Sequence, residues 1–417
     1  MIHPLPVPAL DPGAVFPELE KAIARGDWVL LQSLGARPGR EALGEWDLPS
    51  GGGVVIASGG SQGGRSFCLQ PWGHLDRSAE ACAHWLEGVG LSPERLLVLN
   101  PLPPDHVSGL MPWWRSRAWG SMHQRLDAAL MKSPKELWAF SQALPGWGKT
   151  QAVVSLVPTQ LKRLMEHPDG VAWLQQLALV WVGGAALPVP LANRARTLGV
   201  RLAPCYGATE TVAMVAAQTP DQFLRGAVGC GAPLVDVELR VDRDGALLVR
   251  TNRLAVARWR GGQWTELADA EGWWRTGDAA VLSKPSKGQL QLEICGRLDG
   301  AIHSGGHTVF PEQLGQRLLL EAQEQDMPIE AIFLLPVESP EWGERLVALI
   351  RLCKATASAA EWPSLESRLR AITAKWMPAE RPVAWYSCDQ LELSATGKWQ
   401  RARWQNWLLS QESAQMP

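Results

Sequence analysis

Short apolar runs alternate with segments of helical periodicity between residues 54 and 217, and this alternation limits the folds open to the chain. Repeated strand–helix units build a largely parallel sheet with helices on its faces, so the pattern predicts an α/β fold. Ligands of such sheets bind where strands end, which is where the loops at residues 58, 106, 183 and 206 fall. The predicted strands are Val54–Ala57, Leu96–Leu99, Ala152–Val157, Leu177–Val182 and Val200–Ala203, and the predicted helices begin near His74, Pro158 and Pro190.

The pattern changes to short strands and turns after Gly226. Residues Val235–Val241 alternate in polarity, Asp244-Gly245 is a hairpin signal, and Ala246–Val249 is a second strand. This texture predicts a small β subdomain at about residues 226–297.

The tail of the chain has two apolar strands, near residues 332–335 and 346–352, and a helix at about 364–376 with one apolar stripe. A length of 417 residues exceeds what one compact core usually holds. The sequence therefore predicts a large N-terminal domain over residues 1–297, with mainly parallel sheets flanked by helices, and a smaller α+β C-terminal domain over residues 298–417.

Composition excludes several classes of function. The chain has 40 basic and 42 acidic residues mixed along its length, so no long-range field favours nucleic acid. The longest uncharged run, residues 174–192, is interrupted by glycines and prolines and predicts no membrane span. Seven scattered cysteines without a C-x-x-C pair, and an N-terminus without a signal-peptide pattern, predict a cytoplasmic protein with reduced thiols. The sequence leaves the oligomeric state open.

The stretch Pro204–Thr211 combines residues that suit a nucleotide. Tyr206 offers a ring that can stack on a base, and Gly207 lets the backbone approach a ligand closely. Thr209 can donate to a phosphate oxygen, and Glu210 can supply a hard oxygen to Mg²⁺. An ordinary strand-to-loop junction explains the same eight residues equally well.

A second candidate is the loop Ser58–Arg65, which directly follows a predicted strand. Closely spaced glycines and serines, including Gly59 and Ser61, let backbone N–H groups converge on an anion, and Arg65 would neutralise its charge. The loop lacks the Lys-Ser/Thr pair of the common phosphate loop. A flexible glycine-rich hairpin is the alternative.

Three further polar residues are ambiguous when each is considered alone. Asp278 follows a tight turn and could hold the hydroxyls of a ribose, although an Asp after Gly is more often a turn residue. His106 lies in an apolar loop, where a histidine is usually only packed. Lys398 ends a polar turn and is typical of a solvated surface charge.

The identity and order of these motifs resemble the acyl-adenylate-forming, or acyl-CoA synthetase, superfamily from Ser58 to Arg401. The specific matches are Tyr206–Glu210, Thr276-Gly277-Asp278, Gly296–Asp299 and Thr396-Gly397-Lys398. The compact length, the form of the 206–211 motif and the segments His106–Leu110 and Ser304–Gly306 are most similar to the o-succinylbenzoate-CoA ligase family.

The resemblance implies an ATP-dependent, AMP-forming ligase with two half-reactions. A carboxylate first attacks the α-phosphorus of ATP to give acyl-AMP and pyrophosphate, and the thiol of coenzyme A then displaces AMP, in menaquinone or phylloquinone synthesis. The resemblance implies that Lys398 bridges the phosphate and the attacking carboxylate, that Thr209 donates to the phosphate, and that Glu210 holds Mg²⁺. The residues that it assigns to the adenine are Tyr206, Gly183, Gly184 and Ala185, and Gly207 is a further nucleotide-binding residue.

The resemblance also implies roles for the remaining motifs. Asp278 and Arg297 grip the ribose, residues Ser58 to Arg65 hold the β- and γ-phosphates, and His106 lines the acyl pocket. The C-terminal domain rotates about a hinge at Asp299, so that the loop with Gly305 and Gly306 replaces Lys398 in the second step.

Two departures from the superfamily pattern leave alternatives open. The loop Ser58–Arg65 lacks the usual proline and ends in arginine, which keeps the charge but changes its geometry. Only 57 residues precede it, so part of the first subdomain is expected to be trimmed. The alternatives are a ligase for another aromatic or fatty acid, and a nucleotide-binding relative without catalysis.

Overall fold

The protein, described from a computed structural model, divides into two compact units. The first comprises Met1–Thr276 with Val281–Ile294, and the second comprises Gly277–Ala280 with Cys295–Pro417. The structure describes residues 2–8, 11–33, 47–58, 66–260, 262–284, 288–353, 361–392 and 399–415.

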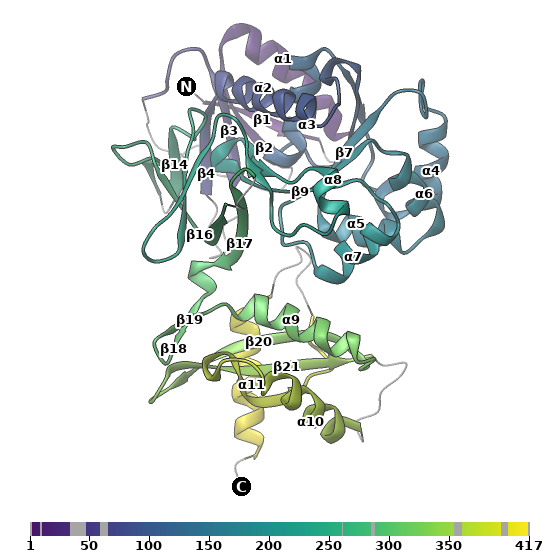
Figure 1. Ribbon diagram of the computed structural model, residues 1–417. Helices are drawn as coiled ribbons and strands as arrows, with labels where there is room; N and C mark the ends of the chain where they lie inside the picture. Colours follow the sequence, from purple (N-terminus) through teal and green to yellow (C-terminus); the bar gives the residue numbers. More distant parts are fainter. Residues whose placement is uncertain are drawn as a thin grey trace. The chain divides into compact units, whose positions relative to one another are not determined.

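A six-stranded mixed sheet in the first unit has the order β1-β2-β3-β4-β14-β15 (Figure 1). β1, β2 and β3 run parallel, whereas β4, β14 and β15 are added antiparallel. Helices α1, α2 and α3 pack apolar side chains against Val54 and Ile56 of β3. The strands are β1 (Ile2–Val7), β2 (Trp28–Ser33), β3 (Gly53–Ser58), β4 (Ser66–Pro71), β14 (Ala257–Arg260) and β15 (Gln263–Glu266), and the helices are α1 (Val15–Arg25), α2 (Trp72–Gly88) and α3 (Val107–Trp119).

A seven-stranded sheet, of order β11-β10-β9-β8-β7-β5-β6, forms the other half of this unit. Its strands from β9 to β6 pair in parallel, and β10 and β11 are antiparallel. Helices α4 to α7 bury Leu137, Leu161, Trp173 and Ala195 against it (Figure 1). The strands are β5 (Leu97–Asn100), β6 (Met122–Arg125), β7 (Ala152–Leu156), β8 (Leu179–Val182), β9 (Leu202–Ala208), β10 (Ala213–Ala217) and β11 (Ala232–Pro233), and the helices are α4 (Pro134–Gln142), α5 (Pro158–Met165), α6 (Pro168–Gln176), α7 (Val189–Thr197) and α8 (Pro220–Leu224).

A four-stranded sheet follows, in the order β12-β13-β16-β17. It covers most of the predicted β subdomain, but β14 and β15, which lie in the same stretch of sequence, pair with β4 in the six-stranded sheet instead. Its strands are β12 (Glu238–Val241), β13 (Ala246–Arg250), β16 (Trp274–Ser283) and β17 (Gln291–Arg297).

The second unit is built on the antiparallel pair β20 and β21. β22 adds in parallel to β21, and α9 and α10 bury Leu318 and Leu369 in its apolar core. The elements are β18 (Ile302–Ser304), β19 (His307–Val309), α9 (Pro311–Glu324), β20 (Ile329–Ser339), β21 (Gly343–Leu352), α10 (Trp362–Thr373), β22 (Pro382–Ser387) and α11 (Arg401–Gln415). Short 3₁₀ helices in the chain are η1 (Pro12–Ala14), η2 (Pro93–Arg95), η3 (Leu130–Lys132), η4 (Thr209–Thr211), η5 (Leu298–Gly300) and η7 (Pro378–Glu380).

One local prediction is wrong. The sequence predicts a strand that ends at Ala203, whereas β9 continues through Ala208. The strand is longer because β10 folds back antiparallel and pairs Ala213 with Ala208 and Ala217 with Cys205. The turn between the two strands consists of η4 and Val212. The predicted strands at 54–57, 96–99, 152–157 and 177–182 are confirmed to within two residues at each end.

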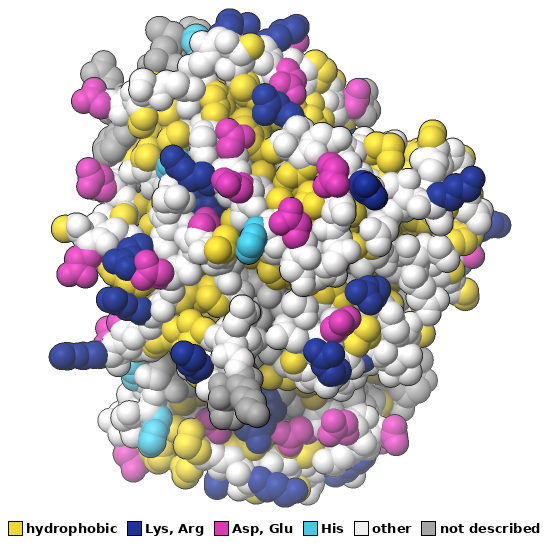
Figure 2. Space-filling model, turned by 45° about the horizontal axis from the view of Figure 1, so that its top comes forward, with side chains coloured by type: hydrophobic (Ala, Val, Ile, Leu, Met, Phe, Trp, Pro, Cys, Tyr) yellow, Lys and Arg dark blue, Asp and Glu magenta, His cyan; other side chains and the backbone are white. Residues whose placement is uncertain are grey.

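The surface carries no large region of a single charge sign on the face in view. Figure 2 shows Lys and Arg side chains interspersed with Asp and Glu side chains, in keeping with the formal net charge of -2. Within the described ranges, the helices are too short or too polar to cross a membrane.

Candidate active site

The turn that follows β9 lies at the carboxyl end of a parallel strand. Tyr206 and Gly207 belong to the end of β9, and Thr209 and Glu210 open η4. Gly207 is required here because a Cβ at this position would clash with the carbonyl oxygen of Ala213 on β10. The close pairing of β9 and β10 thus fixes where the turn begins.

The backbone of this turn is held by the six-stranded sheet. Gln70 of β4 is fully buried, and its Nε2 donates to the carbonyl oxygens of Thr209, at 2.9 Å, and Glu210, at 3.2 Å. The backbone N–H of Ala255 also donates to the Glu210 carbonyl, at 2.8 Å. These bonds occupy the main-chain acceptors and leave the side chains of Thr209 and Glu210 to other partners.

A buried ion pair supports the far side of the turn. Arg253 is fully buried, and its Nε lies 2.6 Å from a carboxylate oxygen of Asp236. The guanidinium also donates to the carbonyl oxygens of Thr211 and, at 2.9 Å, Met214. These contacts fix the local backbone. If one partner were lost, a polar or charged group would be left unpaired in the apolar interior, which is costly.

The backbone directly after η4 is strained. Val212 has φ of 50° and Ala213 has φ of 75°, a region that side chains with a Cβ rarely adopt. The hydroxyl of Ser78 on α2 donates to the Val212 carbonyl at 2.7 Å, and the hydroxyl of Thr211 donates to the Ala213 carbonyl at 2.7 Å. Strain held in place by surrounding bonds is frequent at functional sites.

Ser58, at the end of β3, lies beside the same region. Its Oγ is 2.5 Å from Oγ of Ser66, the cross-strand partner on β4. Burial raises the pKa of the nearby Cys68 thiol well above its usual value, the Glu210 carboxylate raises it further, and Arg258 and a hydrogen bond from Ser58 oppose the rise. Ser58 of β3 and Glu210 of η4 therefore both act on the pKa of the Cys68 thiol.

Two more predicted loops follow strands of the seven-stranded sheet. Exposed His106 precedes α3, after β5, and its carbonyl accepts from the N–H groups of Gly109 and Leu110. The loop Gly183–Ala185 follows β8, where a Cβ on Gly183 would lie 3.0 Å from Sγ of Cys205. Both loops thus share the carboxyl edge of the sheet with the turn at Thr209, and their contacts with a nucleotide or an acid stay predictions.

The second unit contains the predicted ribose and hinge residues. Arg297 forms a bidentate pair with Asp299, at 3.1 and 3.0 Å, and reaches Asp278 at 3.3 Å. The hydrogen bond that Arg297 donates to Asp299 is the main cause that raises the pKa of Arg297, and Asp278 contributes to the rise. Two carboxylates on one guanidinium keep Asp278 aligned with Arg297, and the hinge role of Asp299 stays a prediction.

Gly305 and Gly306 form the tight turn between β18 and β19, with φ of 55° and 82°. A Cβ on Gly305 would lie 2.5 Å from the Trp342 ring, so this turn needs glycine there. Gly59, Ser61, Arg65 and Lys398 lie outside the described residues.

Sequence reasoning missed the residues that position the turn: Gln70, Ser78, Asp236 and Arg253. Each of these residues can be noticed in the sequence only as a polar residue within or beside an apolar segment. The groups to which most of them form hydrogen bonds are far away in sequence. A polar side chain in a buried strand such as Phe67–Gln70 could have been flagged, since it must find hydrogen bonds.

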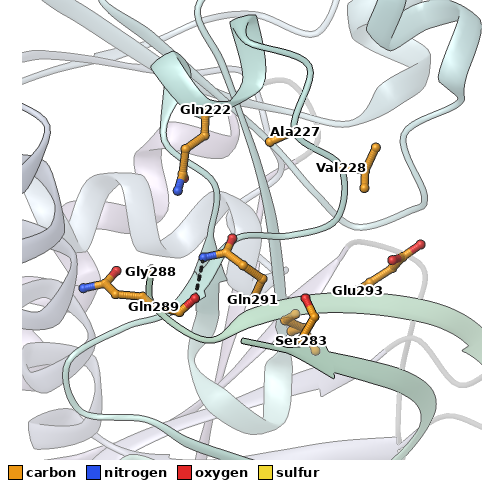
Figure 3. Close-up of a pocket in the computed structure, with 9 residues that line it drawn as sticks. Gln222, Ala227, Val228, Ser283, Gly288, Gln289, Gln291 and Glu293 are labelled. Atoms are coloured by element: carbon orange, nitrogen blue, oxygen red, sulfur yellow. Dashed lines mark hydrogen bonds between the residues drawn. The ribbon is translucent and has the colours of Figure 1, made fainter. Parts of the chain in front are cut away.

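A separate cavity of about 500 Å³ lies beside β16 and β17 and is shown in Figure 3. The side chains of Gln222, Gln291 and Glu293 line it, and Nε2 of Gln291 donates to the Gln289 carbonyl at 3.1 Å. Its described lining contains no residue predicted to bind nucleotide or acid, so it is distinct from the turn at Thr209.

Comparison with known proteins defines the class. Residues 98–253 match the family model described as AMP-binding enzyme. The chain is 31% identical over 287 residues to the 2-succinylbenzoate–CoA ligase of Escherichia coli, covering 69% of this chain and 54% of the relative. It is 30% identical over 333 residues to the Salmonella typhimurium ligase of the same name, covering 79% of this chain and 66% of that relative.

A solved structure supports the same class. The structure of E. coli MenE with a bound phenylether-linked analogue of OSB-AMS is 25% identical, with a TM-score of 0.62, over 96% of this chain and 81% of that chain. The chain carries an AMP-binding enzyme domain, and its fold is that of the adenylate-forming enzymes. The resemblance and the fold class predicted from the motifs are thereby confirmed. The chain spans about half to two thirds of the length of the two curated relatives.

Proposed function

We propose that this protein is an ATP-dependent, AMP-forming ligase that activates o-succinylbenzoate as its acyl-adenylate and transfers the acyl group to coenzyme A. The observation that carries the proposal is the turn at Thr209 and Glu210. It lies within the AMP-binding match, ends a parallel strand, and is held by the buried side chains of Gln70 and Arg253. The identity of the acid rests on the similarity to the 2-succinylbenzoate–CoA ligases.

The first half-reaction places growing negative charge on the α-phosphate, which preorganised donors and cations stabilise. In our proposal the Thr209 hydroxyl donates to this phosphate, and Lys398 neutralises both the phosphate and the attacking carboxylate. Ser58 and its loop, with Gly59, Ser61 and Arg65, hold the β- and γ-phosphates. The bonds from Gln70 to the Thr209 and Glu210 carbonyls hold the turn in one position while the charge develops.

The donors at the turn fit Mg²⁺. This ion usually takes one or two protein carboxylates and completes its shell with water and substrate phosphates. In the described part of the chain no group of three or more His, Cys, Asp or Glu side chains could form a dedicated metal cage. Glu210 would hold the ion together with phosphate oxygens of the substrate. When bound, Mg²⁺ would neutralise charge on the phosphates.

The remaining roles concern recognition of the nucleotide and the acid. Tyr206, Gly207 and the loop Gly183–Ala185 would bound the adenine, and His106 would line the acyl pocket. Asp278 and Arg297 would grip the ribose hydroxyls, a role that suits a carboxylate already oriented by its guanidinium partner.

The second half-reaction needs coenzyme A at the same phosphorus. We infer that a C-terminal domain, residues 298–417, turns about Asp299 relative to residues 1–297, so that the turn at Gly305 and Gly306 replaces Lys398. We further infer that the enzyme acts in the cytoplasm, in a pathway to menaquinone or phylloquinone.

The proposal is tested by pyrophosphate release from ATP with o-succinylbenzoate, compared with a panel of benzoates and fatty acids. We expect o-succinylbenzoate to give the highest kcat/KM and a coenzyme A thioester to form. A higher kcat/KM for another acid would correct the substrate, and no release across the panel would contradict the ligase.

A further inference from the structure

One face of the six-stranded sheet carries a polar strip of which only Ser58 has been assigned a role in binding ATP. Side chains alternate between the faces of a strand, so Ser66, Cys68 and Gln70 of β4 share one face. Residues directly opposite each other on antiparallel strands also share a face. Ser58 is opposite Ser66, and Arg258 of β14 is opposite Cys68, which places both on this face.

The strip leads from the turn at Thr209 to the ends of β3 and β4. Gln70 marks its first end, through the bonds to the carbonyls of Thr209 and Glu210. The paired hydroxyls of Ser58 and Ser66 mark its other end. Arg258 lies between these two ends. It pairs with Cys68, and Ser66, the cross-strand partner of Ser58, lies two residues away from Cys68 on β4.

Arg258 brings a permanent positive charge to this position, because a guanidinium does not lose its proton in proteins. Its Nε is buried and has no hydrogen-bond partner within the part of the chain that the structure describes. A buried donor without a partner costs free energy, so such groups usually serve a ligand, an ion or water. The cross-strand pairing of Arg258 with Cys68 places this charge beside the Cys68 side chain.

We propose that Arg258 binds the pyrophosphate portion of ATP, meaning the β- and γ-phosphates that leave in the first half-reaction. The inference rests on the proposed ligase function and assigns a phosphate contact to a residue outside the loop Ser58–Arg65. A guanidinium presents a planar fork that matches two phosphate oxygens, and the hydroxyls of Ser58 and Ser66 supply further donors beside it. In the proposed mechanism Glu210 would hold the metal ion that neutralises the same polyphosphate.

The carboxylate of the acid substrate is the other anion that this site could receive. The two serine hydroxyls favour the phosphates, because a polyphosphate has acceptor oxygens along the whole strip, whereas one carboxylate would leave the hydroxyls or the guanidinium unused. The two anions are distinguished by separate binding measurements.

The test is calorimetric binding of four ligands, each in the presence of Mg²⁺, to the full chain: MgATP, inorganic pyrophosphate, AMP and o-succinylbenzoate. The variants are Arg258→Gln, Arg258→Lys and the charge-matched control Arg243→Gln, which lies in the exposed turn after β12. We expect Arg258→Gln to weaken pyrophosphate and MgATP about tenfold or more, while AMP changes less than about twofold. Arg258→Lys should fall between this variant and the wild type, since it keeps the charge without the fork.

Equal weakening of AMP and pyrophosphate would indicate a structural role and overturn the inference. Weaker binding of the acid alone would assign Arg258 to the carboxylate and overturn it too. If Arg258→Gln does not fold, Arg258→Lys provides the test. Unchanged pyrophosphate affinity in Arg258→Lys would show that the planar guanidinium does not bind the phosphates as proposed. Wild-type protein that binds neither MgATP nor pyrophosphate refutes the proposed function and this inference together. Wild-type binding that Arg258→Gln leaves unchanged refutes this inference alone.

Discussion

Gln70 and Thr209 join the two large sheets of the first unit: Nε2 of Gln70, on β4, donates to the carbonyl oxygen of Thr209, at the end of β9, at 2.9 Å. Gln70 is fully buried, so its donor end of the bond lies away from water, where a hydrogen bond is stronger than an exposed one. The position of the candidate phosphate-binding turn therefore depends on a strand 139 residues earlier in the chain.

Replacing Gln70 with leucine should impair both stability and adenylate formation. The substitution removes one of the two donors to each of the Thr209 and Glu210 carbonyls, which costs about 1–3 kcal/mol of unfolding free energy. The turn would then be held less firmly, and kcat for pyrophosphate release should fall more than KM for ATP rises. Urea unfolding and steady-state kinetics measure both. Gln176→Leu, at the exposed end of α6, is the control and should change neither.

Gly207→Ala should destabilise the protein although it adds only one methyl group. The new Cβ would clash with the Ala213 carbonyl, so β9 and β10 would have to separate. We expect a loss of about 2 kcal/mol or more, because backbone atoms cannot move aside as a side chain can. Gly73→Ala, in α2 with open space around it, is the matched control and should be neutral or stabilising by up to about 1 kcal/mol. Equal stability of the two variants would contradict this account.

The local patterns of the sequence were sufficient to predict where most buried strands lie. They were insufficient to predict which strands pair with each other. Apolar runs such as Val54–Ala57 and Ala152–Val157 become strands because their residues must be buried wherever they lie. The extension of β9 through Ala208 depends instead on β10 returning to pair with it, and the pairing of β14 with β4 joins residues nearly 190 positions apart. Periodicity carries no information about such long-range pairs.

The candidate site likewise contains residues that local sequence patterns identify and residues that depend on contacts distant in sequence. Thr209 and Glu210 were identified because a motif places them together in sequence, and their side-chain chemistry can be judged there. Gln70 and Arg253 were not identified, because their function is to bond carbonyl groups that any sequence contains. What a motif cannot show is the set of buried donors that fixes its backbone.

Arg253 and Asp236 should be strongly coupled. Arg253→Met leaves the Asp236 carboxylate without its cation and removes the donors to the Thr211 and Met214 carbonyls. We expect a loss of about 3–5 kcal/mol in unfolding free energy. In Arg253→Met/Asp236→Asn the loss should be smaller than the sum of the two single losses, as a double-mutant cycle by urea unfolding would measure. Additive losses would mean that the pair is not an energetic unit.

The protein should lose stability as the pH falls from about 6.5 towards 4. Burial lowers the pKa of His74 and of His123 to about 4, with smaller contributions from Arg77 and Arg125 respectively. Over this range the unfolded chain binds protons at these two rings and the folded chain does not, so acid favours unfolding. The urea midpoint should therefore drop between pH 7 and 4.5, and less in His74→Gln/His123→Gln. His84→Gln, at an exposed position, should retain the wild-type pH dependence.

Lys398→Ala should separate the two half-reactions. In the proposed mechanism Lys398 contacts the α-phosphate and the attacking carboxylate only while the adenylate forms, because the turn at Gly305 and Gly306 takes its place for thioester formation. Removing a cation aimed at transition-state charge slows a reaction about 10²- to 10³-fold. We expect that loss in pyrophosphate release from ATP and acid, with thioester formation from supplied acyl-AMP and coenzyme A within about twofold of wild type. Lys375→Ala, in the linker after α10, is a charge-matched control for the first measurement. Equal loss of both half-reactions in Lys398→Ala would show that one arrangement of the chain serves both steps, and the exchange of Lys398 for the glycine turn would then be wrong.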